Sequence, residues 1–387
     1  MDYFGVSRQK LEEAGGYWTA HEILQQPQVW NWVRELIAED SAALRAFLSP
    51  LLAKRNLRVV LTGAGTSAFI GECAAPALAL HSDLRVEAVP TTDLVGSPER
   101  TLPRHLPTLL VSFARSGNSP ESVAAVKLAE QCVADCHHLI FTCNEEGDLN
   151  HEAPRLRNAH VVLLPKQTND QGFAMTSSFS GMLIAVALTF HLLSNDAKVT
   201  AQWGRWAEQM LQGALPLIKE LAHAGFERMV YLGTGALEGL AREAALKTLE
   251  LSDGRVVAVS ETPLGFRHGP KTIVNAKTLV VVMVSNDAHA RRYDVDLLQE
   301  LRRDGVAGRV LALSAQSLPG QHNADDIVLT EASQASDLAL CLPYAAFAQT
   351  LAYLQSLALG LRPDMPNARG VVSRVVQGVT IYPMEAA

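Results

Sequence analysis

Two short stretches of the chain carry side chains suited to binding a phosphate group. These are "GAGTSA" (63–68) and "ARSGNSPES" (114–122), and each follows an apolar run typical of a buried strand. In the second stretch, Ser119 is a good helix N-cap and Pro120 favours the first helical position, so the free N–H groups of that helix point back into the loop. Hydroxyls that would complete a cage for a phosphate dianion, without a lysine, come from Thr66, Ser67, Ser116 and Ser119.

Other phosphate-binding motifs fit these loops less well. No Gly-Lys-Ser/Thr follows either glycine pair, which argues against a Walker-type nucleotide site. "GAGTSA" does fit G-x-G-x-x-A, but a dinucleotide site also needs an acidic residue at the end of the second strand. There the chain has Glu87 inside the strand and Asp93 beyond it. A dinucleotide enzyme is therefore the weaker hypothesis, and serines that merely cap helices are a further alternative.

A second set of candidate groups lies later in the chain. The segment "ALEGLAREAALKTLELS" (236–252) predicts a helix on which Glu243, Lys247 and Glu250 share one stripe, beside a mostly apolar one. On an isolated helix this pattern favours a solvent-exposed ion-pair face. The glycine-rich loop that follows holds three basic side chains: Arg267, His268 and Lys271. A histidine in such a loop is exposed or functional, and a carboxylate with an imidazole is suited to proton transfer.

The elements that must position these groups repeat along the chain. Three apolar runs recur after 170 residues (228 − 58, 255 − 85 and 278 − 108), and a fourth pair, 139–143 and 310–314, recurs after 171. "HVVLLP" and "DIVLTE" close the two halves. Short β-branched runs that alternate with helical patterns predict a parallel α/β sheet, so the chain is expected to hold two copies of one five-stranded domain. Ligands of such sheets gather beyond the carboxyl ends of the strands.

The same pattern predicts the domain organisation. Long apolar helices are expected to close the two halves, over Thr176–Leu193 and Leu338–Leu359. The expected divisions are an N-terminal helical segment (1–50), a first domain with the phosphate loops (51–200), a linking helix (201–225), a second domain (226–361) and a C-terminal tail (362–387).

Composition narrows the class of protein. The 387 residues are 48% hydrophobic and 19% charged, as in a compact globular protein, and the net charge of −7 argues against a nucleic-acid surface. No secretory signal opens the chain, and polar residues and Pro343 interrupt the longest apolar segment, which argues against a membrane span. Five cysteines without a Cys-x-x-Cys pair indicate free thiols in a reducing cytoplasm. The following residues fit no zinc spacing, and no metal is expected: Cys132, Cys136, Cys143, His137 and His138.

With these features the chain resembles a known family, the double SIS-domain sugar isomerases, and within it the AgaS-type galactosamine-6-phosphate deaminase/isomerases. The resemblance covers nearly the whole chain and rests on "GTS" (65–67), "SGNSPES" (116–122), "ALKTLELS" (245–252) and "RHGP" (267–270). "TAHEILQQPQVW" near the start and "RVVQGVTIYP" near the end resemble the AgaS branch. The resemblance implies two tandem SIS domains, each a flavodoxin-like or Rossmann-like three-layer sheet, that act on a sugar phosphate as a homodimer or larger assembly without a cofactor.

The resemblance also implies roles for particular residues. The helix glutamate that moves a proton between C2 and C1 maps to Glu250, the loop histidine that opens the sugar ring to His268, and the helix lysine to Lys247. Phosphate would be held by Thr66, Ser67, Ser116 and Ser119, with added charge from Arg115, and other substrate contacts would come from Gly65, Gly117, Asn118 and Arg267.

One departure from the wider family lies in the second loop. Glucosamine-6-phosphate synthases read Ser-Gln-Ser-Gly-Glu-Thr where this chain reads "ARSGNS", so Ala114 replaces a hydroxyl and Arg115 an amide. No glutaminase domain precedes the repeat, since position 2 is Asp2, so the catabolic direction is expected. The expected reaction converts galactosamine 6-phosphate to tagatose 6-phosphate and ammonia. Alternatives are a plain aldose/ketose isomerase of tagatose or galactose 6-phosphate, a glucosamine-6-phosphate deaminase, and a sugar-phosphate-sensing regulator.

Overall fold

The chain forms two parallel sheets of five strands each. The computed structural model describes residues 2–318 and 323–384. Contacts divide the chain into two compact units, and the chain passes between them several times, first within α3, Gln26–Glu39. The first-sheet unit comprises residues 32–169, 177–195 and 369–387, and the second-sheet unit comprises residues 1–31, 170–176 and 196–368.

The first-sheet unit has the strand order β4-β3-β5-β6-β7, and every neighbouring pair is parallel. Its strands are β3 (Arg58–Thr62), β4 (Arg85–Ala88), β5 (Thr108–Ala114), β6 (Cys136–Thr142) and β7 (Ala159–Leu163). Its helices are α4 (Ser41–Leu52), α5 (Thr66–Leu80), α6 (Thr91–Gly96), α7 (Pro98–Thr101), α8 (Pro120–Cys132), α9 (Asp148–Glu152) and α10 (Ser177–Thr189).

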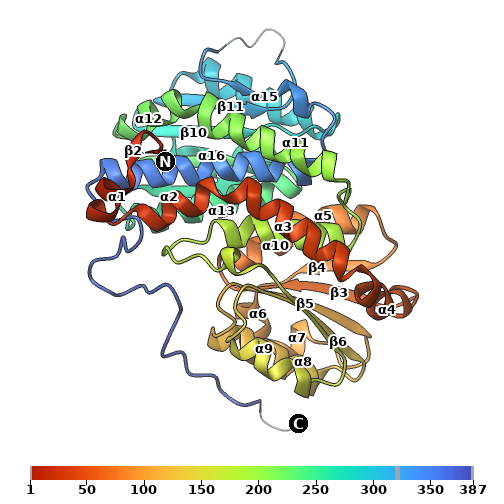
Figure 1. Ribbon diagram of the computed structural model, residues 1–387. Helices are drawn as coiled ribbons and strands as arrows, with labels where there is room; N and C mark the ends of the chain where they lie inside the picture. Colours follow the sequence, from red (N-terminus) through yellow and green to blue (C-terminus); the bar gives the residue numbers. More distant parts are fainter. Residues whose placement is uncertain (1, 319–322, 385–387) are drawn as a thin grey trace. The chain divides into compact units, whose positions relative to one another are not determined.

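Helices cover both faces of this first sheet. Figure 1 shows α6, α7, α8 and α9 on one face, and α5 and α10 on the other. On the first of these faces, Val60, Leu110 and Ile140 of the central strands pack in one apolar core with residues of α6 and α8. Helix α10 is buried along its whole length, as its mostly apolar sequence predicts, and its three serines are buried with it.

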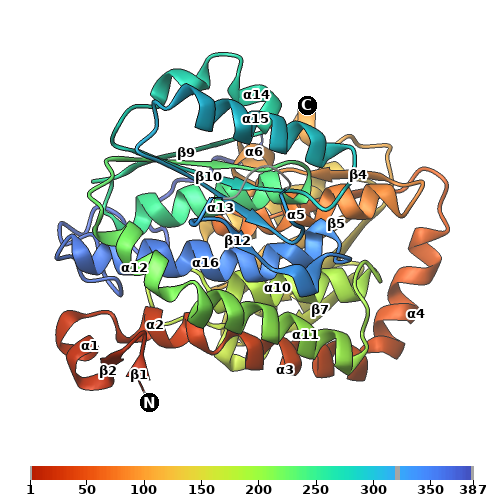
Figure 2. The same ribbon diagram turned by 90° about the horizontal axis from the view of Figure 1, so that it is seen from above.

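The second-sheet unit repeats this topology with the order β12-β11-β10-β8-β9. Its strands are β8 (Arg228–Leu232), β9 (Val257–Glu261), β10 (Thr278–Met283), β11 (Arg309–Ser314) and β12 (Ile327–Val328). Its helices are α1 (Arg8–Ala14), α2 (Tyr17–Leu24), α11 (Ala197–Glu208), α12 (Leu215–His223), α13 (Ala236–Leu251), α14 (Pro263–Phe266), α15 (Ala290–Asp304) and α16 (Asp337–Ala358). Figure 2 shows α14 and α15 on one face of the sheet, and α13 and α16 on the other.

The predicted fold class is confirmed: each half is a five-stranded parallel α/β sheet flanked by helices. The predicted apolar helices appear as α10 and α16, within a few residues of the expected bounds. Two short strands, β1 (Asp2–Tyr3) and β2 (Val6–Ser7), form an antiparallel pair that the sequence did not predict. The described part of the tail, 362–384, has neither helix nor strand. The predicted domain boundaries stay predictions.

No helix among the described residues is long and apolar enough to cross a membrane. Helix α16 comes nearest in length, with 22 residues. It contains Pro343 and packs along α13, α12 and α11 of its own unit. Its apolar surface is therefore used inside the protein, as expected from the sequence.

Candidate functional site: a polar switch point and a buried lysine

The two predicted phosphate loops lie at the switch point of the first sheet. β3 and β5 are neighbouring parallel strands, with Arg58 opposite Thr108 and Thr62 opposite Ser112. The chain leaves β3 into α5 on one face of the sheet and leaves β5 into α8 on the other. The loops therefore diverge at the carboxyl edge of the sheet, which is where α/β sheets of this topology bind ligands.

The β3–α5 loop needs its glycines. Gly65 has φ 56° and ψ −128°, in the left-handed range of φ that favours glycine. A Cβ on Gly63 would lie 2.5 Å from the backbone carbon of Ser67. This close turn brings the start of α5 back over the end of β3. Thr66 and Ser67 are consequently only 4% and 5% exposed at the helix N-terminus.

The β5–α8 loop is held by its own side chains. Ser119 caps α8, because its Oγ accepts from the Ser122 N–H at 3.3 Å and donates to Ser122 Oγ at 2.6 Å. Asn118 Oδ1 accepts from the Asp148 N–H at 2.8 Å, which fastens the loop to the start of α9. Gly117 has φ 68°, and Ser116 Oγ accepts from the Asn118 N–H at 3.3 Å. Asn118 therefore positions the loop, and its predicted contact with substrate stays a prediction.

Sequence reasoning missed most of a group of buried hydroxyls at the same edge, in which it had named only Thr66. The hydroxyls of Thr62, Thr66, Thr91 and Ser112 have no hydrogen-bond partner among the described residues. Thr62 and Ser112 are cross-strand partners, and the Thr91 N–H donates to Gly63 O at 2.8 Å. Buried hydroxyls without partners cost free energy, so a cluster of them indicates a place built for a polar ligand. The available signal was a hydroxyl residue at or near the end of an apolar run: Thr62 ends β3, and Ser112 lies two residues before the end of β5.

Arg115 lies directly after β5 and is 7% exposed. Its Nη2 donates to the carbonyl oxygen of Arg374 in the C-terminal tail at 2.6 Å. The guanidinium therefore joins the second loop to the tail within the first-sheet unit. Its predicted role as added charge for the phosphate stays a prediction.

The second-sheet unit holds the predicted catalytic pair on α13. Lys247 is fully buried, and its Nζ lies 3.6 Å from Glu243 Oε1 and within hydrogen-bond distance of Glu250 Oε2. Glu250 keeps 24% of its side chain exposed, whereas Glu243 is buried. The expectation of a solvent-exposed ion-pair face is wrong, because α13 packs against α16 and β9 as well as β8. The structure thus brings Lys247 and Glu250 together, with Glu250 as the partner that reaches solvent.

His268 lies in an exposed loop that is tied to α15. Arg267 Nη2 lies 2.7 Å from Asp296 Oδ2, and its Nε lies 2.8 Å from Glu300 Oε2. Burial alone would lower the pKa of Arg267, but these two carboxylates raise it. Lys271 bonds the same Glu300. Arg267 is therefore engaged by acidic side chains and fixes the loop that presents His268.

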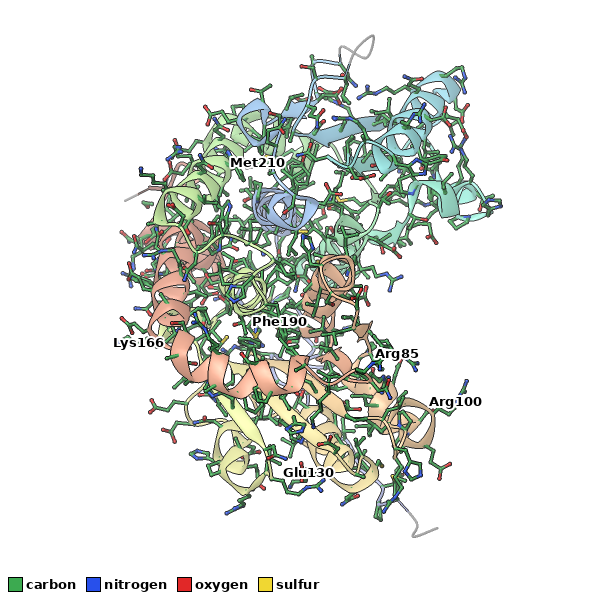
Figure 3. The ribbon with its side chains drawn as sticks, turned by 90° about the vertical axis from the view of Figure 1, so that its right-hand side faces the viewer. Arg85, Arg100, Glu130, Lys166, Phe190 and Met210 are labelled. Atoms are coloured by element: carbon green, nitrogen blue, oxygen red, sulfur yellow. The ribbon has the colours of Figure 1, made fainter. Side chains whose placement is uncertain are left out.

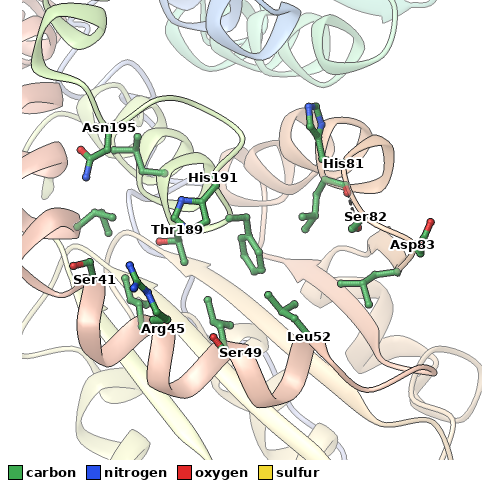
Figure 4. A pocket seen from close by; sticks show the side chains of 17 residues that line it. Ser41, Arg45, Ser49, Leu52, His81, Ser82, Asp83, Thr189, His191 and Asn195 are labelled. Carbon is green, nitrogen blue, oxygen red and sulfur yellow. Dashed lines mark hydrogen bonds between the residues drawn. The ribbon is translucent and has the colours of Figure 1, made fainter.

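One cavity of the first-sheet unit lies away from the two loops. It has a volume of about 490 Å³ and lies between α4 and the ends of α5 and α10 (Figure 4). Arg45, His81, Thr189 and His191 are among its lining residues. The cavity is lined by the C-terminal end of α5, whereas Thr66 begins that helix. It contains none of the predicted site residues, so it does not compete with the switch point as the candidate site.

Comparison with known proteins shows the family of the chain. A family model described as the SIS domain matches residues 51–192. The chain is 47% identical over 380 residues to the D-galactosamine-6-phosphate deaminase AgaS of Escherichia coli, covering 96% of this chain and 97% of that protein. It is 45% identical to the protein of the same name from Shewanella, with 98% and 95% covered.

Solved structures extend the comparison. The crystal structure of a tagatose-6-phosphate ketose/aldose isomerase from Escherichia coli matches with a TM-score of 0.89 and 44% identity, over 96% of this chain and 98% of that one. A glucosamine-6-phosphate deaminase from Thermotoga maritima shares the fold, at a TM-score of 0.65 and 20% identity, over 93% and 99%. The fold and the switch-point loops therefore define a SIS-domain protein with two such domains in tandem. Within that class, the chain belongs to the AgaS family.

Proposed function

We propose that this protein converts galactosamine 6-phosphate and water to tagatose 6-phosphate and ammonia. The observation that carries the proposal is the identity of 45–50% with AgaS deaminases across almost the whole chain. The pair of buried Lys247 and partly exposed Glu250, together with the hydroxyl-lined switch point, supports the proposal with groups suited to this chemistry.

The proposed mechanism starts with the open-chain sugar. His268 assists ring opening, and Glu250 takes the C2 proton, which leaves an enolamine across C1 and C2. Lys247 offsets negative charge near this pair. Return of the proton to C1 gives a ketimine at C2, and addition of water to that carbon releases ammonia and leaves the ketose. These steps balance without a redox change, so the proposal needs no cofactor.

Substrate binding is proposed to depend on the first-sheet loops. Thr66, Ser67, Ser116 and Ser119 hold the phosphate, assisted by the N-terminus of α8 and by the charge of Arg115. This binding is remote from the reacting carbons and would hold them in position. We further propose that the protein works in the cytoplasm as a homodimer or larger assembly.

Ammonia release tests the proposal. We expect the wild type to release ammonia from galactosamine 6-phosphate faster than from glucosamine 6-phosphate. Glu250→Gln should lower kcat by roughly 10²–10⁴-fold, the range for loss of a general base. Glu238→Gln is the matched control, because Glu238 lies on the same helix in an exposed ion pair with Arg242, and it should leave kcat unchanged. Equal loss in both variants would contradict the role of Glu250.

A second candidate function rests on the solved isomerase at 44% identity. A plain aldose/ketose isomerase would use the same groups on a sugar that carries oxygen at C2. It predicts interconversion of tagatose and galactose 6-phosphates with no ammonia from either amino sugar. Assaying both reactions on one preparation separates the two functions.

A further inference from the structure

A cluster of three metal-ligating side chains lies at the opposite end of β6 from the candidate site. Cys136 and His138 are two residues apart on that strand, so they point to the same face of the sheet. Glu130, in the last turn of α8, lies over that face; Figure 3 labels it. Their donor atoms all lie within 4.8 Å of one another. Sequence reasoning missed the cluster because Glu130 comes from a separate element.

We propose that Glu130, Cys136 and His138 bind one divalent transition-metal ion of the zinc class. Their donors are a carboxylate oxygen, a sulfur and an imidazole nitrogen, which is a set that zinc and cobalt(II) accept. His138 is fully buried and Cys136 is 1% exposed, whereas the Glu130 side chain is 18% exposed and leaves a path from solvent.

Two of the three distances between donor atoms suit a tetrahedral ion with little movement. His138 Nε2 lies 2.9 Å from Glu130 Oε1 and 3.4 Å from Cys136 Sγ. Usual zinc bond lengths in a tetrahedron place a nitrogen about 3.3 Å from an oxygen and about 3.6 Å from a sulfur. Both pairs therefore need to open by only a few tenths of an ångström. The fourth position would be taken by water.

Arg157 orients the carboxylate. Its Nε donates to Glu130 Oε2 at 2.7 Å, and its Nη2 donates to the Glu130 carbonyl oxygen at 3.0 Å. Oε1 is thereby left facing His138 and Cys136. In known metal sites, residues that do not bind the ion themselves hydrogen-bond to the ligands and orient them in this way.

Metal binding at this cluster requires Cys136 and His138 to free their donor atoms of protons. Binding replaces the thiol proton of Cys136 by the ion and releases that proton to solvent. A proton on His138 Nε2 would pass to Nδ1, which is buried and has no hydrogen-bond partner among the described residues. Because no acceptor supports that proton, the affinity should be lower than in sites whose histidine is buttressed.

The geometry of the cluster does not fit a catalytic triad, in which a cysteine nucleophile is paired with a histidine base and an orienting acid. In such a triad the thiol and the acid contact different nitrogens of the ring. Here both contact Nε2 of His138. The position at the start of β6, away from the loops that follow β3 and β5, also predicts that the ion takes no part in the proposed reaction on the sugar phosphate.

Titration of chelator-treated full-length protein with cobalt(II) tests the proposal. We expect one equivalent per chain, with the near-ultraviolet charge-transfer band of a cobalt–thiolate bond, and no change in kcat for ammonia release. Cys136→Ser should remove the band and weaken zinc in competition with a chromophoric chelator by at least about tenfold. Cys132→Ser is the matched control, because that half-buried thiol lies outside the cluster, and it should keep the band.

A second variant keeps the test decisive if Cys136→Ser does not fold. His138→Gln retains the thiol, and it should lose affinity for cobalt(II) by a similar factor. Absence of a thiolate band in the wild type would overturn the proposal, since the three side chains would then form only a hydrogen-bonded cluster. An unchanged band in Cys136→Ser, or unchanged cobalt(II) affinity in His138→Gln, would overturn it as well.

Discussion

Glu22 of α2 shows how one buried carboxyl can make stability depend on pH. It is 2% exposed, accepts from the Gly172 N–H at 3.1 Å, and faces Asp170. Burial first, and then the charges of Asp170 and Asp364, raise its pKa to about 9. The folded protein therefore holds a proton that the unfolded chain loses near its ordinary pKa of 4.5. The stabilisation is fully present below that value and is lost as pH rises toward about 9.

We therefore expect the free energy of unfolding to fall between about pH 5 and pH 9, by at most about 1.4 kcal/mol per pH unit from this group. Glu22→Gln removes the titration and should flatten the curve over that range. Urea unfolding at several pH values measures both slopes. Parallel slopes for the wild type and the variant would show that other groups cause the dependence.

At the scale of elements, Ser119 has two separable tasks. It caps α8 through its Oγ, and it is proposed to contact phosphate. Ser119→Ala removes both, so it should destabilise the protein by about 1 kcal/mol and raise KM. Ser119→Asp keeps a good N-cap but repels phosphate, so it should retain stability and raise KM further. Urea unfolding and steady-state kinetics of the two variants provide the comparison. A KM unchanged in Ser119→Asp would remove Ser119 from the phosphate site.

The strands and helices were largely predictable from the sequence, because the repeat shows the apolar pattern of each strand twice. Four strand pairs recur at offsets of 170 or 171 residues, and both sheets have the predicted five strands. The β1–β2 pair was missed because two-residue strands carry no period. Helix α13 shows the other limit: its stripe was predicted, but burial of Lys247 depends on the neighbouring α16 and β9. Clusters whose residues come from several elements, such as Glu130 with the residues of β6, can be recognised only once the fold is known.

At the scale of the molecule, the two repeats have the same turn after their first strand, but different side chains surround it. Gly65 and Gly235, 170 residues apart, have nearly the same backbone angles. In the second sheet, however, Leu237 stands where the first has Ser67. There Thr234 Oγ1 and the Ser285 N–H donate to the buried carboxylate of Asp294, at 2.8 and 2.9 Å. A buried carboxylate therefore lies beside this turn of the second sheet and would repel a phosphate, which favours one phosphate site per chain.

Division of labour between the repeats leads to a prediction about assembly. We predict that, in the proposed homodimer, His268 serves the site of a second copy of the chain. If it does, Glu250→Gln and His268→Asn chains, each inactive alone, should complement one another when co-expressed. Random pairing makes half of the dimers mixed, and each mixed dimer has one intact site, so about a quarter of wild-type activity is expected. Ammonia release from the purified mixture measures it. Activity no greater than that of the separate variants would mean that each site takes both residues from one chain.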